Sequence, residues 1–188
     1  MVPQLQRAQG RQLLREAEGY LEIVTIFEDL YGVDSEYVAR LARRAIEILA
    51  RLERSTDQRG LLRYLQGWGW LLLEEYDQAL TNLHEAANWM PENTDVWLLQ
   101  GRCHLQLGNL DMAVQATEEA FLANDMDARV HYQLARCWSL ANSSKLAVAH
   151  LSRAIDLDAG YRDFVAGERD FDPIREDPQF VTLLSIVA

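Results

Sequence analysis

The side chains of this chain best suited to bind a metal ion or to act as nucleophiles are two cysteines and four histidines. No pair of histidines has the HxxH or HExxH spacing that would bring two ligands together on one face of a helix. We therefore predict no metal site and no cofactor. The residues concerned are Cys103, Cys137, His84, His104, His131 and His150.

Carboxylates and phosphate-binding loops give no enzymatic pattern either. The pairs Glu74-Glu75 and Glu118-Glu119 fall in a predicted turn and on an outer helix, where solvation explains them. The chain has no glycine-rich phosphate loop, no GxSxG motif and no convincing nucleophile–base pair. The sequence therefore predicts a protein that is not an enzyme.

A fixed 34-residue period is the strongest pattern in the chain. It recurs three times with no slip, and such a period is typical of stacked helical hairpins that cannot bury their apolar faces alone. The recurring sets are Gly67, Gly101 and Ala135; Trp70, His104 and Trp138; Ala79, Ala113 and Ala147; Leu80, Val114 and Val148; and Ala86, Ala120 and Ala154.

Counted from Gly60, Thr94 and Ala128, the three units occupy residues 60–93, 94–127 and 128–161. The pattern resembles the tetratricopeptide repeat, which favours a small residue at position 8, an aromatic residue at 11 and alanine at 20 and 27. The resemblance implies an all-α, right-handed superhelical solenoid of helix-turn-helix repeats. Each unit is imperfect, with departures at Arg63, Gln66, Gln100, His104, Thr117 and His131.

The flanks are predicted to be helical caps. Residues 1–59 contain two apolar helix stripes separated by Gly32–Ser35, with Asp34 or Ser35 as the second N-cap. This hairpin is a cap or a degenerate repeat, and a self-associating helical pair is the alternative. Residues 162–188 are predicted to form capping helices, the last with Asp177 as its N-cap and Pro178 as its first residue.

The cysteines share one repeat position on successive first helices. Helices at this spacing are about 8–10 Å apart, which is beyond the reach of a disulfide. We predict that Cys103 and Cys137 are reduced packing residues in a cytoplasmic protein.

Charge and hydropathy exclude several classes of function. The net charge is −11, and residues 64–127 hold eleven acidic side chains with Arg102 as their single basic one. Such an acidic balance disfavours nucleic-acid binding. The favoured interpretation of the acidic middle is a solvated convex face, and a docking patch for a basic partner is the alternative. Neither a signal peptide nor an apolar run of the ~18 residues needed to cross a bilayer is found.

The resemblance also implies a binding surface, because the first helices of tetratricopeptide repeats line a concave groove. Side chains beyond the core stripe form a second, partly apolar stripe that needs a partner: either a peptide from another protein or the chain's own terminal helices. The Lys/Asn/Arg clamp for carboxylates is missing, because Tyr64 and Trp68 stand in its place. The predicted groove residues are Leu61, Tyr64, Trp68, Leu71, Leu98, Arg102, Leu105, Arg129, Tyr132 and Arg136, with Asp95 and Ser139 at the remaining positions.

The sequence thus favours a non-enzymatic adaptor that binds a peptide or helix of another protein in this groove. One alternative is a cytoplasmic chaperone or assembly factor for a secreted or complex subunit, since type III secretion chaperones have similar size and acidity. Another is a docking subunit of a separate enzyme. Self-association is also possible.

Overall fold

The computed structural model describes the backbone of residues 2–31, 35–52 and 58–185 and the side chains of residues 8–24, 36–52 and 58–185. Every regular element within these ranges is a helix, as predicted. The chain divides into two compact units, Met1–Pro91 and Glu92–Ala188. The boundary falls beside the end of the first predicted repeat, 60–93.

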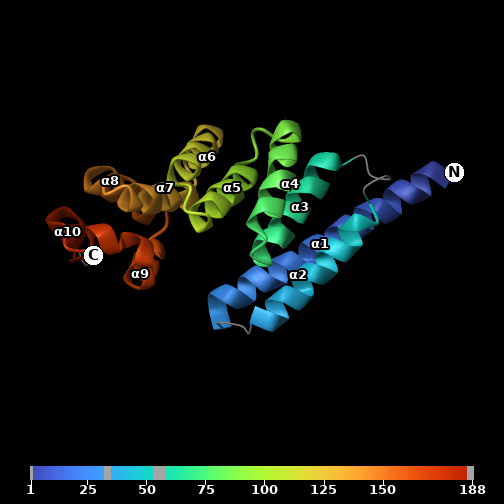
Figure 1. Ribbon diagram of the computed structural model, residues 1–188, viewed down its shortest axis with the longest axis horizontal. Coiled ribbons are helices and arrows are strands. Elements are labelled where there is room, and N and C mark those ends of the chain that lie inside the picture. The colour runs from blue at the N-terminus through green and yellow to red at the C-terminus, as the bar shows by residue number, and fades with distance from the viewer. Residues whose placement is uncertain (1, 32–34, 53–57, 186–188) are drawn as a thin grey trace. The chain divides into compact units, whose positions relative to one another are not determined.

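The first unit consists of two helical hairpins (Figure 1). Helix α1 (Val2–Tyr31) pairs with α2 (Ser35–Ala50), and α3 (Arg59–Leu72) pairs with α4 (Tyr76–Trp89). The predicted break between the first two helices is confirmed, because α1 ends at Tyr31 and α2 begins at Ser35. The proposed cap Asp34 lies outside the described residues.

The second unit contains two further hairpins and a C-terminal segment. Helices α5 (Thr94–Gln106) and α6 (Leu110–Ala123) form the first hairpin, and α7 (Ala128–Leu140) and α8 (Ser144–Leu157) form the second. They are followed by α9 (Tyr161–Gly167), the 3-10 helix η1 (Arg169–Ile174) and α10 (Pro178–Ser185). Asp177 is the N-cap of α10 as predicted, since its Oδ1 accepts a 2.8 Å hydrogen bond from the backbone N–H of Gln179.

Small residues allow the two helices of each hairpin to approach closely. Ala79, Ala113 and Ala147 are all fully buried, in agreement with the predicted register. At Gly67, a Cβ atom would lie only 2.6 Å from Cγ of Leu83 on the opposite helix. Even the Cβ of alanine would therefore collide with Leu83, which is why glycine stands at this position of the first repeat.

The turn inside each repeat has the same backbone geometry three times. Glu74, Gly108 and Asn142 have φ angles of 61°, 71° and 55°, and they are 34 residues apart. After Gly108, the Asn109 N–H donates to the carbonyl oxygen of His104 at 2.9 Å, and equivalent bonds follow Glu74 and Asn142. This left-handed residue with its returning hydrogen bond is a Schellman helix end, and Gly108 follows the C-cap Leu107 at the position that favours glycine.

Candidate functional site

In the first unit, the N-terminal hairpin packs against three of the four predicted groove side chains. Leu61, Tyr64 and Trp68 of α3 are half-buried, and Leu71 is buried. The first three pack against a core cluster shared by α1, α2 and α3. Within this unit, the second apolar stripe is therefore partnered by the chain's own hairpin. The buried members of the cluster are Leu14, Ala17, Leu21, Ala45, Ile48, Leu49, Leu52, Leu62 and Leu65.

In the second unit, the C-terminal segment covers Tyr132 on α7. The ring centroid of Tyr132 lies 4.8 Å from that of Tyr161 and 5.8 Å from that of Phe171. Burial, with a contribution from the negative charge of Glu168, raises the pKa of Tyr132 to about 12. This phenol is consequently neutral and forms part of the apolar core.

Arg136, one helical turn further along α7, is held by two carboxylates of the same C-terminal segment. Its Nη2 lies 2.6 Å from Oδ2 of Asp170, and its Nε lies 3.3 Å from Oε2 of Glu168. The side chain of Arg136 is only 17% exposed, so both ion pairs are partly shielded from water. The guanidinium that the sequence offered to an acidic partner is therefore occupied within the chain.

Arg129, in the first turn of α7, also has carboxylate partners within its own unit. Its Nη1 lies 2.7 Å from Oδ1 of Asp95, and its Nη2 lies 2.6 Å from Oδ2 of Asp127. Leu98 on α5 is buried beside Val130 and Leu134. Of the other two predicted groove residues on α5, Arg102 is exposed and Leu105 is half-buried.

The two cysteines are buried free thiols. Burial raises the pKa of Cys103 to about 12 and that of Cys137 to about 11, so neither forms a thiolate at neutral pH. Both are packing residues, as the repeat position predicts. Within the described part of the chain, no three His, Cys, Asp or Glu side chains form a metal-binding group. Nor is any helix in those ranges long and apolar enough to cross a membrane.

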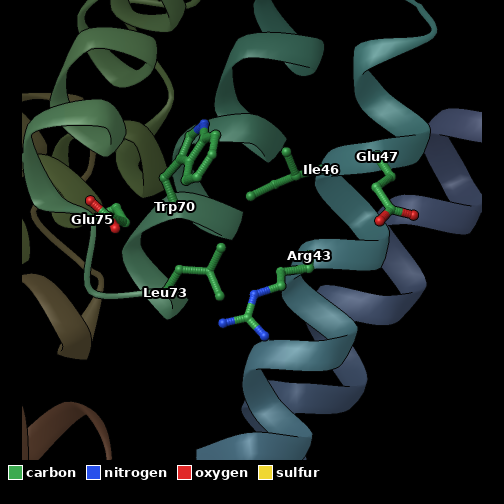
Figure 2. A pocket seen from close by; sticks show the side chains of 6 residues that line it. All are labelled: Arg43, Ile46, Glu47, Trp70, Leu73 and Glu75. Atoms are coloured by element: carbon green, nitrogen blue, oxygen red, sulfur yellow. The ribbon is translucent and has the colours of Figure 1, made fainter.

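Sequence reasoning missed a pocket of about 380 Å³ in the first unit (Figure 2). Trp70, the aromatic residue at position 11 of the first repeat, lines this open space. Figure 2 shows Glu47 and Glu75 on opposite sides of the pocket, so their carboxylates do not converge as an acid–base pair would require. The lining residues are Arg43, Ile46, Glu47, Trp70, Leu73 and Glu75.

Residues 71–137 match the family model described as tetratricopeptide repeat. Together with the helical hairpins and their 34-residue register, this match confirms the predicted resemblance to tetratricopeptide repeats.

Solved structures show the same fold. The structure titled MamA MSR-1 has a TM-score of 0.57 and is 22% identical, with 80% of this chain and 94% of that chain covered. MamA 41-end from Desulfovibrio magneticus RS-1 has a TM-score of 0.59 and is 17% identical, with 84% and 96% covered. No curated protein sequence matches this chain.

Proposed function

We propose that this chain is a non-enzymatic adaptor that binds a short segment of another protein on the exposed face of α5. The contact residues are Arg102 and Leu105, whereas Arg129 of α7 is already paired with Asp95 and Asp127. The observation that carries the proposal is that terminal elements of the chain already contact Trp68 of α3 and Arg136 of α7, whereas Arg102 at the equivalent position of α5 is exposed and Leu105 is half-buried.

The chemistry of these side chains defines the partner. The guanidinium of Arg102 favours a carboxylate, and α5 holds it within the strongly acidic middle of the chain. Leu105 lies one turn further along the helix and offers an apolar contact. A partner segment with an acidic side chain next to an apolar one fits this surface, whereas a strongly acidic peptide is repelled by the surrounding carboxylates.

The buried thiols of Cys103 and Cys137 are consistent with a reducing compartment, and we place the protein in the cytoplasm. Adaptor function also agrees with the family, because tetratricopeptide repeats are protein-binding modules.

The proposal is tested by site-specific photo-crosslinking. A photoreactive amino acid replaces Leu105 on α5 in one sample and Glu118, an exposed residue of α6, in the other. We expect a crosslinked partner from position 105 that is lost when Arg102→Glu is added, with helicity unchanged by circular dichroism.

Crosslinks from position 118 alone would contradict this site and would place the partner on the acidic surface formed by the second helices. Absence of crosslinks at both positions, in cells where the protein is present at its natural level, would contradict the adaptor function itself.

A further inference from the structure

The pocket of the first unit has apolar walls that come from two helices. Figure 2 shows Ile46 of α2 pointing between Trp70 of α3 and Leu73, the residue that follows α3. All three side chains are half-buried. Ile46 can pack against α3 because residue 69 is glycine, where a Cβ atom would lie only 2.9 Å from Cγ1 of Ile46. The close approach of the two helices beside the pocket thus holds its apolar walls in place.

Trp70 borders open space, unlike the residue at its position in the second repeat. That residue, His104, is only 6% exposed, whereas the space next to Trp70 measures about 380 Å³. Small-molecule sites have volumes of about 300–1,000 Å³ and are lined mainly by apolar and aromatic side chains with a few polar groups. The pocket has the composition of such a site, and its volume suits a small ligand.

One cation among the lining residues is available to a ligand. Arg43 is exposed, and within the described parts of the chain its guanidinium makes no hydrogen bond or ion pair. The next residue, Arg44, instead pairs with Glu47 at 3.4 Å. A guanidinium presents its N–H donors in a planar fork that fits a carboxylate. The pocket therefore offers an anion-binding group next to an apolar surface.

The two carboxylates at the pocket limit the charge of a ligand. Glu47 already has Arg44 as its partner, whereas Glu75, on the opposite side in Figure 2, forms no ion pair among the described residues. Each additional negative charge on a ligand would be repelled by Glu75. A ligand with a single carboxylate is consequently favoured over a polyacid.

We propose that this pocket binds a small organic acid with one carboxylate and one compact apolar group, aromatic or aliphatic. The apolar group packs between Trp70, Ile46 and Leu73, and the carboxylate pairs with Arg43. The site lies in the first unit and is separate from the protein-binding surface proposed on α5. Because its walls come from α2 and from the end of α3, the bound acid links the N-terminal hairpin to the first repeat.

The test is a titration of the full chain with 3-phenylpropionate and with hexanoate, each compared with its neutral amide. Nuclear magnetic resonance follows the indole Nε1–H signals, and Trp70→Phe identifies the signal of Trp70. We expect this signal to shift with both acids, whereas that of Trp89, which is 60% exposed, should not shift. The amides should bind about fivefold more weakly, because they lack the charge that pairs with Arg43.

Substitutions of opposite charge separate the ion pair from packing. Arg43→Gln should weaken binding of the acids about fivefold and leave binding of the amides unchanged. Glu75→Gln should strengthen binding of the acids about twofold, because a like charge is removed. The matched control is Arg51→Gln, which removes the same charge at an exposed residue that does not line the pocket. It should bind as the unaltered chain does, and circular dichroism checks that each variant is folded.

Three results would overturn the proposal: equal binding of the acids and their amides, equal effects of Arg43→Gln and Arg51→Gln, or no shift of the Trp70 signal with either acid. Tighter binding of N-acetylphenylalanine than of 3-phenylpropionate would also overturn it, and would assign the pocket to the end of a polypeptide chain.

Discussion

The first helices at the two ends of the repeat array are covered by different chemistry. On α3, Tyr64 and Trp68 pack against an apolar cluster that the N-terminal hairpin provides. On α7, the equivalent residues are Tyr132 and Arg136, and the C-terminal segment meets them with both a ring stack and carboxylates. The same two repeat positions are therefore satisfied by burial at one end and by burial plus charge at the other. A repeat position alone therefore does not specify a ligand surface.

Truncating a buried ring of the C-terminal segment should destabilise the protein more than truncating a half-buried ring on α3. Phe171 is fully buried, so Phe171→Ala should destabilise the second unit by about 3–5 kcal/mol. Tyr64→Ala removes a half-buried ring of the first unit and should have about half that effect. Chemical denaturation followed by circular dichroism measures both. Equal losses would show that the C-terminal segment is no more firmly packed than the N-terminal hairpin.

The three repeat hairpins should respond alike to a larger side chain at their shared buried alanine position, although different terminal segments pack against them. Ala79→Leu, Ala113→Leu and Ala147→Leu each add volume where no space remains, and each should destabilise by about 1–3 kcal/mol. The exposed Glu118→Ala serves as the control and should change stability by less than about 0.5 kcal/mol. Thermal shifts that do not distinguish the alanines from Glu118 would refute the register.

The ion pairs of Arg136 with Glu168 and Asp170 should weaken as the salt concentration rises. Arg136→Gln leaves Glu168 and Asp170 without their partly buried cation, and we expect a loss of about 1–2 kcal/mol. The matched control is Arg44→Gln, which breaks an exposed 3.4 Å pair with Glu47 and should cost about 0–0.5 kcal/mol. Unfolding curves at low and high salt measure the difference. If Arg136→Gln is as mild as Arg44→Gln, the ion pairs contribute nothing to the cover.

The smallest effect concerns the three equivalent turns. Glu74 has a left-handed backbone that costs most residues about 1 kcal/mol, so Glu74→Gly should stabilise by about that amount. Asn142→Gly should gain less, because asparagine tolerates this conformation, and Gly108→Ala should lose about 1 kcal/mol. Melting temperatures of the three variants provide the measurement. A destabilised Glu74→Gly would mean that the glutamate side chain makes a compensating contact.

Much of the fold could be predicted from the sequence, because the physical requirements are local and repeated. Close helix approach requires the small residues at Ala79, Ala113 and Ala147, and a tight helix end favours Gly108. The cap at Asp177 followed by Pro178 is similarly a local signal. The 3-10 helix η1 was not predicted, since Arg169–Ile174 has neither a repeat register nor a long apolar stripe.

The candidate site was less predictable, because contacts between segments distant in sequence decide whether its side chains are exposed or buried. A half-apolar stripe containing Tyr64 and Trp68 looks the same in sequence whether it faces solvent, a partner or the N-terminal hairpin. The partners of Arg136 also lie in the irregular segment after the last repeat. The 3.1 Å contact between the Nδ1 atoms of His131 and His150 could have been found by aligning the repeats, which places both at the positions of Arg63 and Asn82.

The chain's own terminal segments cover side chains on the first helices α3 and α7. Hydroxyl-radical footprinting with mass spectrometry tests it on the unaltered protein. We expect slow oxidation of Tyr64, Trp68 and Tyr132 compared with Trp89, which is 60% exposed, and with Phe164, which is 58% exposed. Oxidation of Trp68 and Tyr132 at rates equal to those of Trp89 and Phe164, in the folded protein, would contradict the account.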